Sequence, residues 1–180
     1  FKQKKKFVTK KRFGSGSKYI MIGKNYNEIF DFTKKDRKNF IFQDYIKFDH
    51  ELSVDCFFSS KNNKLLKILP RIRNHIIRGE SVVTSVINNK KFYNLIEMIS
   101  KNLKFSGHVM FQFLVKNKNI YLLECNPRIG GASFISYFNL MDSIYYFILE
   151  KIFPEKYFQI KKKIFVGSKL ILYKKTKYIK

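Results

Sequence analysis

Two pairs of apolar, β-branched and aromatic segments constrain the fold of this chain most strongly. Residues 51–58 and 64–73 flank the polar stretch 59–63, and residues 108–115 and 119–124 flank Lys116-Asn117-Lys118. Strand-like segments separated by short polar turns are typical of β-hairpins, in which the two strands run antiparallel. Further strands are predicted over residues 7–9, 19–22, 40–43 (a buried strand), 81–87 and 164–173.

Helical patterns are fewer than strand patterns. Residues 91–103 place apolar side chains at helical spacing, so they predict an amphipathic helix with one core face: Phe92, Leu95, Ile96, Ile99 and Leu103. A short helix is expected over 27–35, and a helical region over 133–152, broken near Asn139 and ending at Pro154. Antiparallel strands with a few helices packed on them define an α+β fold.

The chain has a formal net charge of +24, which invites a nucleic-acid-binding interpretation. Of its 37 basic residues only six are Arg, and the Lys residues are spread along the whole chain. A Lys-rich solvated surface is therefore the favoured interpretation, with nucleic-acid binding kept as an alternative. The positive field would also favour an anionic ligand.

The cysteines and histidines lack the spacing of a metal site or a disulfide framework. Cys56 and Cys125 are expected to be reduced and mostly buried thiols, and the three histidines are interpreted as structural. No apolar stretch is long enough to span a bilayer, so a soluble cytoplasmic protein is expected. The chain opens on Phe1 rather than Met, which suggests a piece of a longer protein.

The stretch Ile120-Tyr121-Leu122-Leu123-Glu124-Cys125-Asn126-Pro127-Arg128 carries the most chemistry. Alternate side chains of a strand share a face, so Glu124 and Asn126 should point one way and Cys125 the other. A carboxylate and an amide oxygen are hard ligands suited to Mg²⁺, and Gln112 on the partner strand offers another oxygen. Arg128 follows as a fixed cation that can stabilise a transferring phosphoryl group. The alternative is a hairpin that ends in a polar turn with Arg128 paired to Glu124.

Two earlier segments fit an anionic nucleotide. Lys10 precedes a loop of small residues whose backbone N–H groups can approach a phosphate: Gly14, Ser15, Gly16 and Ser17. A plain flexible turn remains an alternative for this loop. Asp44, Tyr45 and Ile46 leave a strand where backbone groups can meet an adenine edge, and Glu51 on the next strand can accept from ribose hydroxyls. An ordinary strand exit remains an alternative here.

In this order the segments resemble the ATP-grasp superfamily, most closely the ATP-binding halves of carbamoyl-phosphate-synthase-type large chains. The resemblance runs from about Val8 to Glu150, and Glu-x-Asn-Pro-Arg is its most specific element. It implies that Lys10 binds phosphate, that residues 44–46 form the adenine hinge and that Glu51 binds ribose. It also implies that Gln112, Glu124 and Asn126 coordinate Mg²⁺, with Mn²⁺ as an alternative ion.

The same resemblance implies an ATP-grasp fold with ATP between two lobes, and the ligation of a small carboxylate to an amine. The expected boundaries are 1–46 for a phosphate-loop lobe, 47–155 for the lobe with the metal site, and 156–180 for a C-terminal extension. Family members carry a preceding α/β domain that is expected to be missing from this chain. A truncated chain that binds ATP without catalysis is therefore a second hypothesis beside the ligase.

Overall fold

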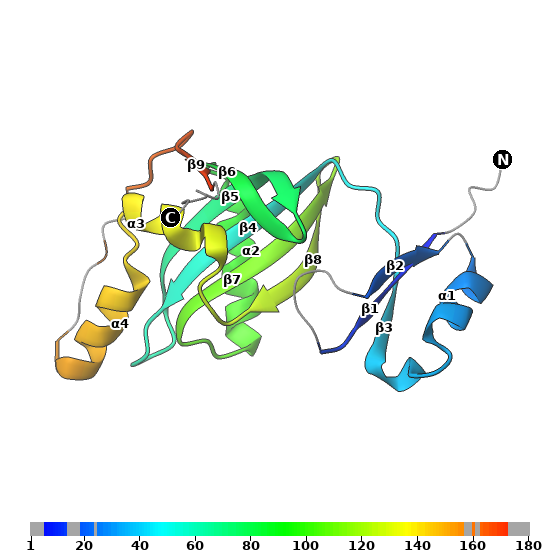
Figure 1. Cartoon of the computed structure of the whole chain (residues 1–180). Helices are drawn as coiled ribbons and strands as arrows, with labels where there is room; N and C mark the ends of the chain where they lie inside the picture. The colour runs from blue at the N-terminus through cyan, green and yellow to red at the C-terminus, as the bar shows by residue number, and fades with distance from the viewer. Residues whose placement is uncertain (1–5, 14–18, 24, 157–159, 161–162, 173–180) are drawn as a thin grey trace, which may run out of the picture. The chain divides into compact units, whose positions relative to one another are not determined.

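The computed structural model divides into two compact units, Phe1–Lys47 and Phe48–Lys180. It describes residues 6–13, 19–23, 25–156, 160 and 163–172 (Figure 1). Each unit has a sheet of its own, with strand orders β2-β1-β3 and β8-β7-β4-β5-β6-β9. Within the described residues no helix combines the length and the apolar composition that crossing a membrane requires.

The first unit is a three-stranded antiparallel sheet with one helix, comprising β1 (Phe7–Lys11), β2 (Ile20–Gly23), α1 (Tyr26–Thr33), a 3₁₀ turn (Arg37–Asn39) and β3 (Phe40–Asp44). Asn25 caps α1 by accepting a hydrogen bond from the backbone of Glu28 at 3.0 Å. The prediction of a buried strand over 40–43 is wrong, since only Phe40 is buried and the rest of β3 is exposed. The physical reason is that β3 is an edge strand in this small sheet.

The second unit is built on a six-stranded antiparallel sheet. Its strands are β4 (His50–Phe58), β5 (Leu65–Ile77), β6 (Glu80–Val86), β7 (Gly107–Lys116), β8 (Asn119–Asn126) and β9 (Lys169–Ile171). The two predicted hairpins are confirmed as β4–β5 and β7–β8. At the β5–β6 turn Arg78 and Gly79 both have positive φ, which matches the twist of a tight hairpin. The last strand is much shorter than predicted.

The helices of this unit are α2 (Lys90–Asn102), α3 (Ile135–Phe138) and α4 (Ser143–Ile152), with a 3₁₀ turn η2 (Gly131–Phe134) before α3. The predicted break near Asn139 is confirmed between α3 and α4. The α+β fold class is confirmed as well, because antiparallel sheets carry these few helices. Leu103 does not join the core face of α2, because it is the extended C-cap residue and no longer follows the helical phase.

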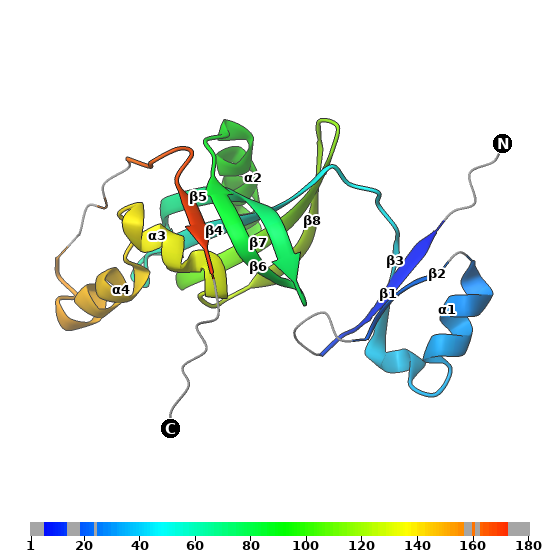
Figure 2. The same cartoon turned by 45° about the horizontal axis from the view of Figure 1, so that its top comes forward.

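The two faces of the large sheet pack differently. Apolar side chains of β4, β5 and β7 form a core with Phe92 and Ile96 of α2 on one face. On the other face Phe57, Leu69 and Ile135 belong to a second, smaller cluster. Figure 2 shows α2 and α3 on opposite sides of the sheet. Polar side chains occupy the remainder of this second face, and they define the candidate site below.

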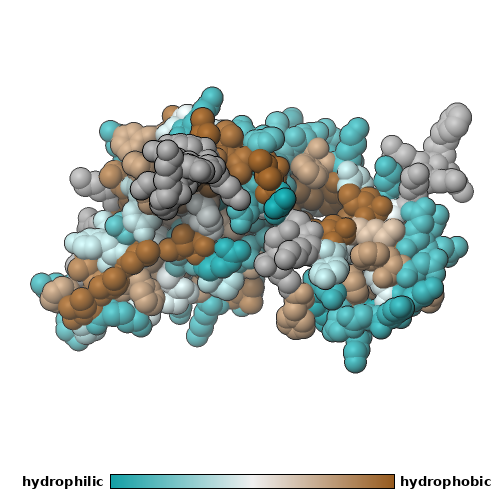
Figure 3. All heavy atoms as spheres, in the orientation of Figure 1, coloured by the Kyte–Doolittle hydropathy of each residue, from teal (hydrophilic) through white to brown (hydrophobic). Residues whose placement is uncertain are grey.

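The surface of α4 carries an apolar stripe. Ile144, Ile148 and Ile152 recur every four residues on one side of the helix and are 49%, 47% and 61% exposed. Hydrophobic side chains gather over this helix in the space-filling view (Figure 3). The helix instead buries Glu150, which accepts hydrogen bonds from Ser59 and Ser60 of the β4–β5 turn.

Candidate functional site

The β7–β8 hairpin brings three predicted ligand residues together. Gln112 lies opposite Glu124 in the strand register, and Asn126 lies two pairs further, opposite Met110. Asn126 Nδ2 donates to Glu124 Oε1 at 2.8 Å, so these two side chains lie on the same face, as the alternation predicts. Cys125 pairs with Phe111, whose side chain belongs to the opposite, α2-covered core.

The environment of Cys125 corrects one expectation. Cys56 is fully buried, as predicted, but Cys125 is exposed. The reason is topological, because β8 is an edge strand of the sheet and its side chains have neighbours on one flank only. Burial raises the pKa of the Cys125 thiol all the same, so it is not an activated thiolate.

The arginine Arg73 occupies the centre of this polar face, and the sequence did not predict it. Its Nη1 donates to Gln112 Oε1 at 2.8 Å and to Glu51 Oε1, and its Nη2 donates to the Gly79 carbonyl at 2.5 Å. Only 5% of the Arg73 side chain is exposed. The guanidinium therefore links β4, β5, β7 and the β5–β6 turn beneath the predicted ligands.

Glu51, the predicted ribose ligand, also belongs to this cluster. Burial raises the pKa of its carboxyl, the charge of Arg73 offsets part of that effect, and the nearby charge of Glu124 adds to it. Glu51, Arg73 and the neutral Gln112 amide thus form one hydrogen-bonded group, with Glu124 close enough to raise the pKa of Glu51.

The donor set has the chemistry that a Mg²⁺ ion requires. Glu124 supplies a carboxylate, while Gln112 and Asn126 supply amide oxygens, and all three are hard oxygen donors. A half-rotation of the Asn126 amide exchanges Oδ1 and Nδ2, which occupy almost the same space. It would therefore present the oxygen to the same region. Among the described residues no group of three or more His, Cys, Asp or Glu side chains gathers as metal ligands, so a site here depends on the amides. The residues fit Mg²⁺.

Arg128 follows the strand on an exposed turn. Its Nη1 donates to the Ile129 carbonyl at 3.3 Å, and its backbone N–H donates to the Asn126 carbonyl at 2.8 Å. No ion pair between Arg128 and Glu124 occurs in the described part of the chain, so the alternative in which these two residues pair is wrong. The backbone of Arg128 therefore stays tied to the ligand residue Asn126.

The predicted nucleotide-binding residues before Lys47 lie in the first unit. Lys10 lies on β1, where its backbone pairs with Ile20 of β2 and Ile41 of β3. The predicted phosphate loop, Gly14 to Ser17, lies outside the described residues.

The predicted adenine hinge follows β3 of the same unit. Asp44 is the last residue of β3 and is exposed, and Tyr45 and Ile46 follow it half-buried. The Tyr45 N–H donates to the Lys6 carbonyl at 3.0 Å, which fixes the backbone directly after the strand. The structure thus places Asp44, Tyr45 and Ile46 in the first unit, and Glu51, Gln112, Glu124, Asn126 and Arg128 in the second.

A second buried cluster also escaped the sequence analysis. Asp55 of β4 and Arg71 of β5 form an ion pair at 2.7 Å on the same sheet face as Glu51 and Arg73. A sequence signal was available, because Arg71 and Arg73 alternate on one strand of a predicted hairpin while Glu51 and Asp55 alternate on the other. Alternating opposite charges across a hairpin indicate cross-strand pairs.

The comparison with protein families agrees with this architecture. The model of the ATP-grasp domain matches residues 1–132, which is most of the chain. The chain therefore belongs to the ATP-grasp family, and the predicted resemblance is confirmed at that level. The finer resemblance to carbamoyl-phosphate-synthase-type chains stays a prediction. A search of curated proteins found no match.

Solved structures share the fold at low sequence identity. N5-carboxyaminoimidazole synthetase from Staphylococcus aureus, in complex with ADP, is 17% identical, with a TM-score of 0.67 over 86% of this chain and 43% of that one. A biotin carboxylase complex from Campylobacter jejuni is 16% identical, with a TM-score of 0.71 over 91% of this chain and 40% of that one. The biotin carboxylase domain of the Hydrogenobacter thermophilus 2-oxoglutarate carboxylase, in complex with MgADP, ADP and bicarbonate, is 16% identical, with a TM-score of 0.68 over 88% and 39%. The chain thus spans about two fifths of the length of these proteins.

Proposed function

We propose that this chain is the nucleotide- and metal-binding part of an ATP-dependent carboxylate–amine ligase. The observation that carries the proposal is the convergence of Gln112, Glu124 and Asn126 on one sheet face beside Arg128. Membership of the ATP-grasp family supports it, and so do structural neighbours in complex with ADP, or with MgADP, ADP and bicarbonate. ATP and Mg²⁺ are the proposed ligands, with Mn²⁺ as a substitute.

In the proposed reaction a carboxylate oxygen attacks the γ-phosphorus of ATP, and ADP leaves. The resulting acyl phosphate is then attacked by an amine or ammonia, which displaces inorganic phosphate and releases a proton to solvent. Mg²⁺ supplies positive charge to the phosphate oxygens when it is bound. The side chains of the site orient the reactants and balance charge, so no protein nucleophile is required.

The site residues divide this work according to their chemistry. Gln112, Glu124 and Asn126 hold the cation through oxygen atoms, and Arg128 stabilises negative charge on the transferring phosphoryl group. Lys10 and the Gly14–Ser17 loop are assigned to the phosphates. The hinge 44–46 is assigned to adenine, and Glu51 to the ribose edge of the site.

Nucleotide binding by the full chain tests the metal assignment. A fluorescent ATP analogue should bind with Mg²⁺ and lose that affinity in excess EDTA. Glu124→Ala and Asn126→Ala should abolish the Mg²⁺-dependent binding because each removes an oxygen ligand. Cys125→Ala is the matched control, since it lies between them on the same strand but faces the other way. Equal losses from all three variants, with folding intact by circular dichroism, would sink the assignment.

The carboxylate and the amine are the finer part of the proposal. A carbamoyl-phosphate-synthase-like activity would take bicarbonate as the carboxylate and ammonia as the amine. ATP hydrolysis should be screened against pairs of small carboxylates and amines, using the full-length protein that contains this chain. Stimulation by one pair identifies the acceptor class. Mg²⁺-dependent binding without turnover for every pair favours the second hypothesis, a chain that binds ATP without catalysis.

A further inference from the structure

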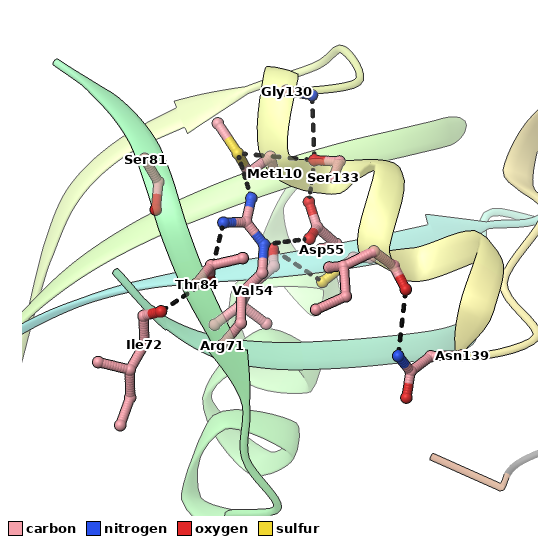
Figure 4. Close-up of polar contacts among 12 residues, drawn as sticks. Val54, Asp55, Arg71, Ile72, Ser81, Thr84, Met110, Gly130, Ser133 and Asn139 are labelled. Atoms are coloured by element: carbon pink, nitrogen blue, oxygen red, sulfur yellow. Dashed lines mark hydrogen bonds and ion pairs between the residues drawn. The ribbon is translucent and has the colours of Figure 1, made fainter. Parts of the chain in front are cut away.

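A buried carboxylate lies on the same sheet face as the predicted ligands, next to them but outside the set of proposed site residues. Asp55 is fully buried in β4, and its Oδ2 accepts from Arg71 Nε at 2.7 Å. Its Oδ1 accepts from the Ser133 hydroxyl and lies 3.3 Å from His108 Nε2. Figure 4 shows Asp55 between the arginine of β5 and the serine that follows β8.

Each guanidinium nitrogen of Arg71, the arginine of this cluster, has a polar contact. Arg71 Nη1 donates to Thr84 Oγ1 of β6 at 3.4 Å, and Arg71 Nη2 lies 3.4 Å from Met110 Sδ of β7 (Figure 4). Burial by itself raises the pKa of the Asp55 carboxyl, but the charge of Arg71 and the contact with His108 outweigh it and hold the pKa well below its usual range. The carboxylate is therefore ionised and held by groups from β5, β7 and the η2 turn.

Ser133 connects the buried Asp55 carboxylate to the loop that follows β8. Its hydroxyl accepts a hydrogen bond from the Gly130 N–H at 3.1 Å while it donates to Asp55. A Cβ at Gly130 would lie 2.7 Å from Met110 Sδ, so the backbone there is in direct contact with the sheet. The connection from Asn126 to Gly130, with three residues between them, is thus held at one end by the β7–β8 pairing and at the other by Ser133.

We infer that Ser133, held by Asp55, is a positioning residue for the metal ligand Asn126 and for Arg128. The inference rests on the proposed function. Without the hydroxyl, Gly130 loses its hydrogen-bonded link to the buried carboxylate, and the loop can move away from Met110. Asn126 then loses the orientation in which its amide oxygen faces the cation. Groups that orient metal ligands from behind typically change metal affinity by about 10- to 100-fold when they are removed.

Binding of Mn²⁺, measured by electron paramagnetic resonance on the full chain with an ATP analogue present, tests the inference. Ser133→Ala should weaken Mn²⁺ binding by about tenfold or more. Ser136→Ala is the matched control, because Ser136 is also buried and lies one helical turn further along the same segment. It should leave the affinity unchanged.

A second pair of variants keeps the inference testable where Ser133→Ala does not fold. Gly130→Ala places a methyl group against Met110 and the Ser133 hydroxyl and should also weaken Mn²⁺ binding. Gly131→Ala meets no atom within 4 Å and should not. Unchanged Mn²⁺ affinity in the folded Ser133 or Gly130 variants, while Glu124→Ala abolishes binding, would overturn the positioning role alone. No effect of Glu124→Ala would overturn the proposed function itself.

Discussion

Two arginine–carboxylate pairs join β4 to β5 on the same face of the large sheet, yet their surroundings differ. Asp55 and Arg71 are 0% and 1% exposed, whereas Glu51 and Arg73 are 13% and 5% exposed. Both pairs join a carboxylate of β4 to an arginine of β5 in the same hairpin, so their chemistry is closely matched. The difference lies in what else each pair touches.

The Asp55–Arg71 pair is saturated by partners that the protein itself supplies. Both Asp55 oxygens accept hydrogen bonds, and the pKa of its carboxyl lies well below the usual range. In the other pair burial raises the pKa of the Glu51 carboxyl, with the charge of Arg73 offsetting only part of the effect. Arg73 Nε is buried without a hydrogen-bond partner among the described residues. The Asp55–Arg71 pair is therefore held by the protein alone, whereas the Glu51–Arg73 pair has contacts that a ligand can replace.

Removal of the arginine from the saturated pair should give the largest effect. Arg71→Met leaves the ionised Asp55 carboxylate buried without its main partner, which typically costs about 3–5 kcal/mol of unfolding free energy. Urea unfolding of the two single variants measures this directly. Arg73→Met should cost roughly 1 kcal/mol, since Glu51 can reach solvent. Equal losses from the two variants would show that the pairs are not energetically distinct.

The next largest effect is the loss of stability at acid pH that the Asp55–Arg71 pair should cause. Because its folded pKa is lowered, Asp55 contributes stability that is fully present above the usual aspartate pKa of 3.8 and is lost as the pH falls below it. The unfolding free energy of the wild type should therefore drop more steeply below that pH than that of Asp55→Asn. Thermal melts between pH 5 and about pH 2 measure the slope. Parallel curves would show that another carboxylate controls the acid transition.

The Glu51–Arg73 pair should affect the metal affinity of the cation site more than the stability of the fold. The Arg73 guanidinium holds Gln112 and Glu51, so its charge competes with a metal ion for the Gln112 oxygen. Arg73→Met should strengthen Mn²⁺ binding in the absence of nucleotide by roughly tenfold, the size expected for one charge at short range in a partly solvated site. Lys91→Met, on the α2 side of the sheet, is the control for a simple change in net charge. A weaker Mn²⁺ affinity in Arg73→Met would mean that the arginine supports the ligands rather than competing with an ion.

The sequence predicted the fold well because its signals are local. Hairpins with polar turns and an amphipathic helix are encoded within short windows, and the β4–β5 and β7–β8 pairs formed as expected. Leu103 and the exposed part of β3 were missed because burial depends on where an element ends and on whether a strand lies at a sheet edge. Neither property is encoded within a single segment.

The candidate site shows the same division between local and long-range information. Alternation along one strand was enough to predict that Glu124 and Asn126 share a face. Arg73 was missed because it is one basic residue among many in a Lys-rich chain, and only the register of β4 against β5 brings it to Glu51. Ser133 and Asp55 are 78 positions apart, so no spacing rule could pair them.

The smallest expected effect concerns the raised pKa of Glu51. Its pKa is raised above the usual glutamate value of 4.5, so the folded state holds the proton more tightly than the unfolded state does. The stability that this provides is fully present below pH 4.5 and is lost as the pH rises through the raised pKa, opposite in sign to Asp55. In Glu51→Gln the unfolding free energy should therefore fall less as the pH rises, by a difference of less than about 1 kcal/mol. Glu97→Gln, on the exposed side of α2, should leave this fall unchanged. If chemical unfolding from pH 4.5 to about 7 gives the same slope for Glu51→Gln and wild type, Arg73 compensates Glu51 as fully as Arg71 compensates Asp55, and the contrast between the pairs disappears.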